Sequence, residues 1–408
     1  MVTGKVQLHV SQLKLGMFVS ELDRPWLGTQ FLFQGFRIQS VQEIERLRTV
    51  CEHVYIDIEK SRTVGAATTR KTAPDRRIYT LAASFEDEIH TANEIRESTR
   101  LTVDQLFDDV AHGRMIDMAG IKRLMHNTVD GVLRNPDAYI CLTQLKQRDE
   151  YTAQHSINVS VLALTLARHL GLNRDDMETL GVAALLHDIG KIKTPLEVLN
   201  KPDRLTSDEL DIMKQHPLIG RQMLENRYQL PYHIADVAFS HHERISGEGY
   251  PRGLKTDEIS VFSKMVAIVD VYDAITSDRC YHDGISPTQA LTKMYNWRLT
   301  DFDGELLEQF IQCVGIYPVG TVVELTSGEV GLVISVNPES RLKPKVNVLL
   351  DREKRPIFPH RVVDLASGQS NDPESNCAVR QVLAPDAYGI NIRETLAPFQ
   401  QAKAKKTG

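Results

Sequence analysis

The chain has 408 residues, of which 42% are hydrophobic and 25% charged, and its formal net charge is −6. This composition indicates a globular protein of more than one domain, and the negative charge disfavours a general nucleic-acid binder. The five cysteines show no CxxC spacing, and no stretch has the apolar length of a signal peptide or membrane span. We therefore expect a cytoplasmic protein with reduced thiols, no DNA partner and no membrane insertion.

Residues 1–70 are predicted to form a small α/β regulatory or docking domain with its linker. Strand-type residues occur at 6–10, 31–38 and 53–59, and Ser40 with Glu43 makes a capping-box pattern before a helical run. The stretch 60–76 is polar and basic, as expected for a solvated linker. No set of metal-ligating or nucleophilic residues occurs in this part.

Residues 71–135 have a charged, helical pattern and are predicted to be a connector between the first domain and a catalytic core. Long helices in this position often form dimers, so a homodimer is one expectation. The heptad pattern is too irregular to establish a coiled coil.

The core is predicted to span 136–318. The stretch 151–170 has the pattern of a helix ended by Gly171, and His155 lies near its start. Asn173 is a plausible N-cap for the next helix, whose apolar run leads into His187-Asp188. Such a helix is buried, and a buried aspartate without a partner is costly, which favours a metal ion or another cation beside Asp188.

Further residues that could bind metal follow, and each could instead have an ordinary structural role. Thr206 and Glu209 form a capping box for a helix that we expect to end near His216, where a histidine could merely complement the helix dipole. His241-His242 is expected to end another helix, with the two rings pointing in different directions. Asp270 lies in an apolar helix and is costly there unless it is paired or bound to metal.

Other residues of this stretch are predicted to support the cluster. Lys191 could contact phosphate oxygens as a point charge or simply be a solvated surface lysine. Gly190 is expected to let the chain turn. Glycines around Tyr250 would allow close approach to a ligand, or only form a surface turn. Asp273 could orient a ligand histidine from behind, whereas His169 is assigned no role.

The end of the chain is predicted to be a β appendage at 319–370 and a tail at 371–408. Strand-like alternation is interrupted at Ser327-Gly328, as expected for a turn between strands. The last seven residues are basic and too few to bury a face. The expected fold class is thus mainly α, a helical-bundle catalytic domain with a small N-terminal α/β domain and a small C-terminal β appendage.

Taken together, these residues resemble the HD-GYP family, a branch of the HD superfamily of metal-dependent phosphohydrolases. The matching segments run in the family's order over about 136–318: HDIGK at 187–191, LNKPDRLTSDE at 199–209, His216, HHE at 241–243, GYP at 249–251, DVYDA at 270–274, and Arg279. The stretch 1–60 resembles a domain of uncharacterised role often placed ahead of HD-GYP domains. The resemblance implies an HD-type helical catalytic domain that hydrolyses the bacterial messenger cyclic di-GMP to pGpG or GMP.

The resemblance also assigns roles residue by residue. The implied metal ligands are His155, His187, Asp188, His216, His241, His242 and Asp270, with Asp188 bridging two ions and, with Lys191, serving catalysis. Lys191, Tyr250 and Arg279 match residues that contact the substrate. Gly249 and Pro251 belong to the signature loop, which the family also associates with diguanylate cyclase (GGDEF) partners.

Two positions differ from part of the family. Some members bind a third metal through a glutamate four residues before the first ligand histidine, where this chain has Tyr151, with Glu150 one place away. We therefore expect two metals, with Tyr151 lining the substrate pocket; the alternative is that it only packs against a helix. Some members also have a second basic residue three positions after Arg279, where His282 stands here.

The chemistry agrees with the resemblance. Two cations about 3.5–4 Å apart can generate a bridging hydroxide and neutralise charge on a phosphodiester. Histidine and carboxylate ligands suit Fe, Mn, Ni, Co or Zn better than Ca or Mg.

Three functions follow in order of preference. The first is a cyclic di-GMP phosphodiesterase. The second is an HD-type hydrolase of another cyclic dinucleotide or nucleotide. The third is a non-catalytic messenger-binding or docking protein, which loss of a metal ligand would favour.

Overall fold

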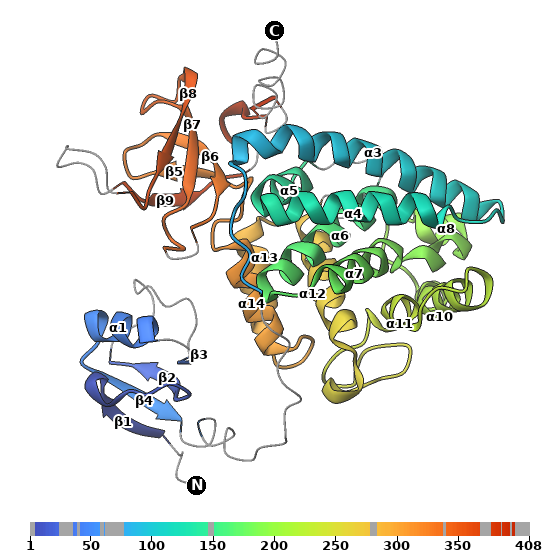
Figure 1. Cartoon of the computed structure of the whole chain (residues 1–408), viewed down its shortest axis with the longest axis horizontal. Helices are drawn as coiled ribbons and strands as arrows, with labels where there is room; N and C mark the ends of the chain where they lie inside the picture. Colours follow the sequence, from blue (N-terminus) through green and yellow to red (C-terminus); the bar gives the residue numbers. More distant parts are fainter. Residues whose placement is uncertain are drawn as a thin grey trace. The chain divides into compact units, whose positions relative to one another are not determined.

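The computed structural model describes residues 5–23, 36–38, 41–57, 61, 77–145, 151–277, 284–337, 340–367, 377–384, 386–391 and 394–395. The chain divides into two compact units, 1–75 and 76–408 (Figure 1). Helices dominate the second unit, and small antiparallel sheets occur near both ends of the chain. The predicted fold class is confirmed.

The first unit is a small antiparallel sheet with a helix. Its strands lie in the order β1-β4-β2-β3, and its elements are β1 (Lys5–His9), η1 (Val10–Gln12), β2 (Phe18–Leu22), β3 (Phe36–Arg37), α1 (Val41–Val50) and β4 (His53–Asp57). Leu47 of α1 and Val54 of β4 are fully buried and belong to one apolar core. The predicted helix is confirmed at α1, whereas Ser40 and the side chain of Glu43 lie outside the described residues.

The second unit is a helical bundle arranged around α6. Its elements are α3 (Phe85–Ala111), α4 (Met118–Arg134), α5 (Pro136–Thr143), α6 (Tyr151–Leu170), α7 (Arg174–Leu186), η2 (Ile189–Lys193), α8 (Leu196–Leu199), α9 (Ser207–Met213), α10 (His216–Gln222), the π-helical turn η3 (Met223–Arg227), α11 (Tyr232–Ser240), η4 (Thr256–Glu258), α12 (Val261–Thr276), α13 (Pro287–Asn296) and α14 (Gly304–Val314). α6 contacts α3, α4, α5, α7, α12 and α14. Of the helices in the described residues, none has the length and apolar character needed to cross a membrane.

Local signals set the helix ends. α6 is followed by Gly171 with φ +75°, a conformation that favours glycine. The Asn173 side chain accepts a hydrogen bond from the backbone N–H of Asp176 at the start of α7. Thr206 and Glu209 form the predicted capping box of α9.

The segment expected to be a connector contributes to the bundle itself. Figure 1 shows α3 lying along α4, and both helices contact α5 and α6. Ile89 and Val103 of α3 and Ile121 and Val129 of α4 are buried. Their apolar faces are covered by the bundle, which explains why the heptad pattern is irregular: packing several helices needs a wider apolar stripe than a two-stranded coiled coil.

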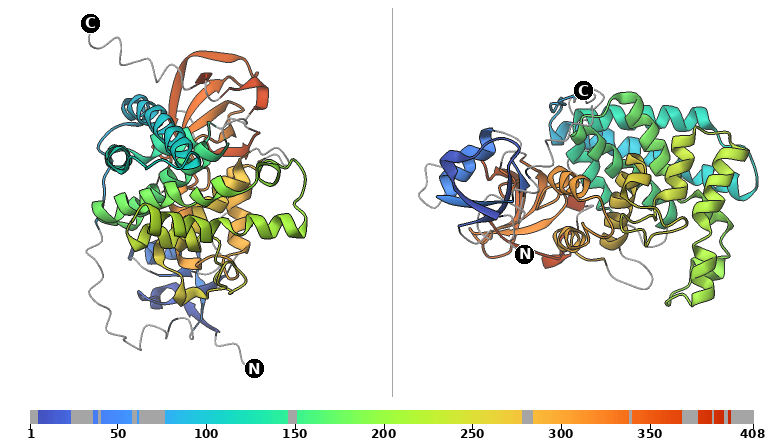
Figure 2. Two further views of the ribbon diagram at one scale, coloured as in Figure 1. Left: turned by 90° about the vertical axis from the view of Figure 1, so that its right-hand side faces the viewer. Right: turned by 90° about the horizontal axis from the view of Figure 1, so that it is seen from below.

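The C-terminal sheet is antiparallel and strongly curved (Figure 2), with the order β8-β7-β6-β5-β9. Its strands are β5 (Val322–Leu325), β6 (Val330–Ser335), β7 (Lys345–Leu350), β8 (Pro356–Asp364) and β9 (Val379–Val382). β9 comes from the stretch assigned to a tail and pairs with β5. A hydrogen bond of 2.6 Å between Ser335 Oγ and the Asp137 carboxylate joins this sheet to α5.

Candidate metal centre

Five helical segments bring the predicted ligands into one buried cluster. His155 comes from the second turn of α6, and His187-Asp188 follows the buried apolar run of α7. His241 and His242 follow α11, and Asp270 lies on α12. His216 begins α10, after a break behind α9, so the prediction that it ends the preceding helix is wrong. Pro217 suits the first turn of the new helix, where its missing N–H is not needed.

Hydrogen bonds from Nδ1 to backbone carbonyls orient three of the histidines. His187 Nδ1 donates to the carbonyl oxygen of Ala184 at 2.7 Å, and His216 Nδ1 to that of Met213 at 2.7 Å. His241 Nδ1 donates to the carbonyl of Ala238 at 3.0 Å. Because a carbonyl only accepts, Nδ1 of each ring must carry a proton, which leaves Nε2 of the neutral ring with a free lone pair.

His155 is held differently, because its Nδ1 lies 2.8 Å from Oδ2 of Asp273. Asp273 thus contacts a predicted ligand histidine at the nitrogen that faces away from the cluster, the position that its predicted orienting role requires. Burial alone would lower the pKa of His155, but its hydrogen bonds to Asp270 and Asp273 raise this pKa to about 9. His155 Nε2 lies 3.0 Å from Oδ1 of Asp270, so this contact joins two of the predicted ligands.

The two oxygens of Asp188 face two different sets of histidines. Oδ1 lies 3.2 Å from Nε2 of His216 and 3.6 Å from Nε2 of His241. Oδ2 lies 3.3 Å from Nε2 of His187 and 3.8 Å from Nε2 of His155. Asp188 is therefore the shared member of two groups of ligand atoms.

These atoms fit divalent cations. Nε2 of His187 and Oδ1 of Asp188 are buried and have no hydrogen-bond partner among the described residues, an arrangement that is costly without a cation. Nε2 of His216 lies 3.3 Å from Nε2 of His241, so two lone pairs face each other. Burial lowers the pKa of His241 to about 4, which keeps its ring in the neutral form that binds metal. Mixed nitrogen and carboxylate ligands are typical of transition-metal sites.

Lys191 projects from η2 onto this cluster and forms an ion pair with Oδ2 of Asp188. The side chain retains 23% exposure, so its ammonium is at once near the Asp188 carboxylate and open to solvent. Gly190 precedes it with no unusual φ. A Cβ there would lie 2.0 Å from the carbonyl oxygen of His216, so the glycine permits close packing against α10 rather than a turn.

The loop after His242 places Tyr250 beside the cluster. Its ring stacks on the His242 ring, with 4.6 Å between centroids and 25° between planes. Lys214 Nζ lies 5.7 Å from the Tyr250 ring centroid, which adds a second cation at this edge. Burial raises the pKa of Tyr250, so its phenol stays protonated and can donate a hydrogen bond.

Glu243 anchors this loop. Its carboxylate accepts hydrogen bonds from the backbone N–H groups of Arg252 at 2.8 Å and Leu254 at 2.9 Å. A Cβ at Gly249 would lie 2.2 Å from the backbone nitrogen of Arg244, so this glycine serves the packing of the loop on itself. Pro251 follows Tyr250 through a cis peptide bond. Sequence reasoning quoted Glu243 within a motif but gave it no role, although a buried acid beside ligands was a usable signal.

Three predicted positions cannot be placed. Arg279 and His282 lie outside the described residues, as does Glu150. Tyr151 begins α6, but its side chain is not among those described. Sequence reasoning also missed Asn158, which donates to Oδ1 of Asp273 at 3.0 Å.

A helical bundle that gathers histidines around a His-Asp pair is the arrangement of HD-domain proteins. Comparison with protein families gives the same class. Residues 139–306 match the model of the HD domain, residues 5–121 a domain of unknown function, and residues 322–371 a KOW domain associated with the HD domain. The second of these matches extends beyond the first compact unit into α3 and α4.

Sequence similarity to named proteins shows which family the chain belongs to. A Pseudomonas aeruginosa protein named as a cyclic di-GMP phosphodiesterase is 37% identical over 374 residues, which cover 90% of each chain. The cyclic di-GMP phosphodiesterase response regulator RpfG of Xanthomonas campestris is 36% identical over 169 residues, 41% of this chain and 45% of the relative. A 3′3′-cGAMP-specific phosphodiesterase of Vibrio cholerae is 37% identical over 147 residues, 36% of this chain and 34% of the relative. The chain belongs to the HD-GYP family of HD-domain proteins.

Proposed function

We propose that this chain is a phosphodiesterase that hydrolyses cyclic di-GMP at a centre of two divalent transition-metal ions. The observation that carries this proposal is the position of Asp188, whose two oxygens face separate sets of histidine Nε2 atoms. A single carboxylate between two ligand sets is what a bridged pair of cations requires. The name of the Pseudomonas relative, similar over nine-tenths of both chains, supports the substrate.

Each ion has its own ligand set in this proposal. His155, His187 and Asp270 would hold one, and His216, His241 and His242 the other, with Asp188 shared. Fe, Mn, Ni, Co and Zn all suit these donors. When bound, the ions would supply Lewis acidity, a water of lowered pKa and charge neutralisation at a phosphodiester.

The chain's own residues then position the substrate. Lys191 extends from Asp188 towards solvent and would place its charge beside a phosphoryl oxygen. Tyr250, with its protonated phenol and its ring fixed on His242, would contact the ligand from the loop side. Lys214, near the same ring, adds positive charge for the second phosphate of a dinucleotide. Arg279 keeps its predicted role in phosphate binding.

The test combines metal analysis with product analysis on cyclic di-GMP. The wild-type protein should contain two transition-metal ions per chain and release pGpG or GMP, whereas Asp188→Ala should lose both properties. His169→Ala is a matched control, because His169 lies on α6 with His155 but bonds to Gln309 at 3.2 Å, away from the cluster. A metal-loaded wild-type protein that binds cyclic di-GMP without releasing product would instead establish a messenger-binding protein.

A second substrate has specific support. The Vibrio relative is named for 3′3′-cGAMP, and its identity to this chain, over a shorter stretch, equals that of the Pseudomonas relative. Comparing kcat/KM on cyclic di-GMP and 3′3′-cGAMP decides between the two, and we expect the higher value on cyclic di-GMP. A cytoplasmic location, a homodimer and docking of diguanylate cyclases on the loop around Tyr250 stay predictions of the sequence.

A further inference from the structure

A continuous chain of side-chain hydrogen bonds runs from α3 to the metal ligand His155. Arg96 Nη2 donates to Oε1 of Gln154 at 2.8 Å, and Gln154 Nε2 donates to Oδ1 of Asn158 at 2.7 Å. Asn158 Nδ2 donates to Oδ1 of Asp273 at 3.0 Å, and Oδ2 of Asp273 accepts from His155 Nδ1 at 2.8 Å. Five residues on three helices therefore form one connected network.

The donor and acceptor of each hydrogen bond between Arg96 and Asp273 are fixed by these two residues. A guanidinium only donates and a carboxylate only accepts, so both amides between them must present oxygen towards Arg96 and nitrogen towards Asp273. The two amide dipoles are then aligned between a cation and an anion, and each bond polarises the next. Gln154 and Asn158 are four residues apart on α6, so they lie on one face of the helix.

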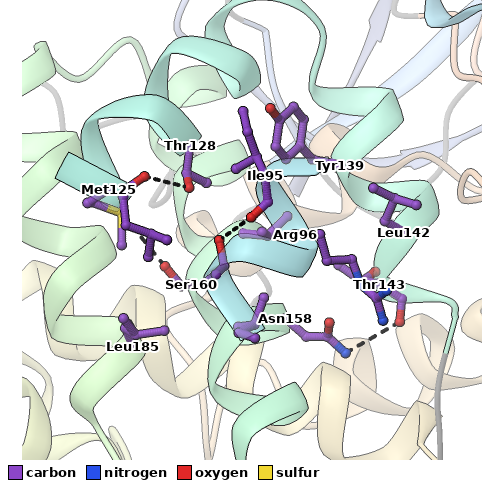
Figure 3. A pocket seen from close by; sticks show the side chains of 14 residues that line it. Ile95, Arg96, Met125, Thr128, Tyr139, Leu142, Thr143, Asn158, Ser160 and Leu185 are labelled. Carbon is purple, nitrogen blue, oxygen red and sulfur yellow. Dashed lines mark hydrogen bonds between the residues drawn. The ribbon is translucent and has the colours of Figure 1, made fainter. Parts of the chain in front are cut away.

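Because the residues of this network are buried, losing one of its hydrogen bonds is costly. Gln154 is 7% exposed, and Asn158 and Asp273 are 2% exposed each, so water does not replace a lost partner at either end. Figure 3 shows Arg96 and Asn158 among the side chains that line an interior cavity between α3, α4, α5, α6 and α7. Asn158 Nδ2 also donates to the carbonyl oxygen of Thr143 at 3.4 Å (Figure 3), so hydrogen bonds to two partners orient this amide.

We infer that Arg96, Gln154 and Asn158 are positioning residues for the metal ligand His155. Asn158 holds the Asp273 carboxylate in the plane where it receives the His155 Nδ1 proton, and Gln154 with Arg96 holds Asn158. Arg96 Nη2 also donates to the carbonyl oxygen of Leu145 at 3.1 Å. α3, which precedes the stretch matched by the HD domain, thereby fixes the end of α5 and the start of α6 with one side chain.

The network touches one half of the centre only. His187, His216 and His241 donate from Nδ1 to carbonyls of their own segments. Weakening the network should therefore lower affinity for the ion at His155 and leave the ion at His216, His241 and His242 unchanged. This inference rests on the proposed function, because it requires that these residues bind two ions.

The test is calorimetric titration of the metal-free full-length protein with Mn²⁺, which resolves two binding steps. Asn158→Leu should weaken one step by about 10-fold, the lower end of the effect expected for partners behind a metal ligand. Arg96→Gln should weaken the same step by a few-fold, and Arg96→Lys, which keeps a cationic donor, should restore it in part. His242→Ala marks the other step by weakening it.

Thr128→Val is the matched control. Thr128 lines the same cavity, but its hydroxyl bonds to Leu124 within α4, so both binding steps should stay at wild-type values. If Asn158→Leu does not fold, Arg96→Gln at the far end of the network decides. Variants that fold and bind both ions like wild type would overturn the inference, as would equal weakening of both steps. Wild-type protein that binds no Mn²⁺ would overturn the metal centre itself.

Discussion

The two halves of the candidate centre are built on different supports. On the α10–α11 side, His216 and His241 are oriented by backbone carbonyls three residues earlier in their own segments. On the α6–α12 side, His187 also has a backbone acceptor, but His155 is oriented by the carboxylate of Asp273, 118 residues later in the chain. A backbone acceptor persists whatever side chain the sequence places there, whereas a side-chain acceptor can be removed by one substitution. The α6–α12 half is therefore the half that mutation can tune.

Removing metal should have the largest effect, because both halves depend on it. Dialysis against a chelator should abolish hydrolysis, and reconstitution should restore it at two ions per chain. Tyr151 replaces the glutamate that would hold a third cation, and a phenol with a reference pKa of about 10 is a poor ligand at neutral pH. Elemental analysis of active protein checks the count. A reproducible count of three, with Glu150 coordinating one ion, would contradict the predicted register at the start of α6.

Asp188→Ala removes the one residue that both halves share. We expect loss of most bound metal and a fall in kcat of roughly 10³-fold or more, because several kcal/mol of charge stabilisation disappear with the ions. His187→Ala should behave similarly. Turnover and metal content are measured on the same samples, with His169→Ala as control. Full turnover by Asp188→Ala would end the proposal of a bridged centre.

Lys191→Ala tests a charge that lies at the junction of the halves. Metal content should stay at wild-type values, because removing a cation beside Asp188 does not disfavour binding of another. Turnover should fall by about 10²-fold, as expected for loss of a charge that acts mainly in the transition state. The measurement is kcat with metal analysis. Wild-type kinetics would reject the role on the phosphoryl group, and loss of metal would show a structural role.

Asp273→Asn should separate the halves. The amide keeps an oxygen for His155 but turns its N–H₂ towards the donor of Asn158, and the negative charge that strengthens the ligand is lost. Affinity for one ion should fall by about 10-fold, without change at the other. Two-step Mn²⁺ titration measures this, with Asp175→Asn at the exposed start of α7 as control. Equal loss at both steps would mean that the halves are not independent.

Glu243→Gln should have the smallest effect, because it acts on the loop and not on the ligands. An amide oxygen can still accept one of the two loop N–H groups, so about 1 kcal/mol of anchoring is lost. We expect KM for cyclic di-GMP to rise by roughly 5-fold with kcat and metal content nearly unchanged. Steady-state kinetics check this. A fall in kcat without any change in KM would place Glu243 in the support of His242 instead.

Local patterns predicted much of this molecule. The caps at Asn173 and Thr206 and the helix end at Gly171 are short-range features, and the structure has each of them. The cluster around Asp188 was also accessible, because buried apolar runs that end in histidine or aspartate are costly without a cation.

Long-range features were not accessible in the same way. Asn158 meets Asp273 across 115 residues and Arg96 meets Gln154 across 58, and no local pattern encodes such pairs. β9 needs the neighbouring edge of β5 to form a strand. His216 was placed on the wrong helix because its neighbours are helical on both sides, and the break after Met213 depends on how α10 packs.

Gly190 allows two backbone segments of the candidate centre to pack directly against each other. Its missing side chain lets η2, which carries Lys191 and follows Asp188, lie directly on the start of α10, with a hypothetical Cβ only 2.0 Å from the His216 carbonyl oxygen and 2.7 Å from the Gly220 nitrogen. The contact is main chain against main chain. The backbones that carry Asp188 and His216 therefore approach closely through main-chain atoms, and no side chain at position 190 separates them.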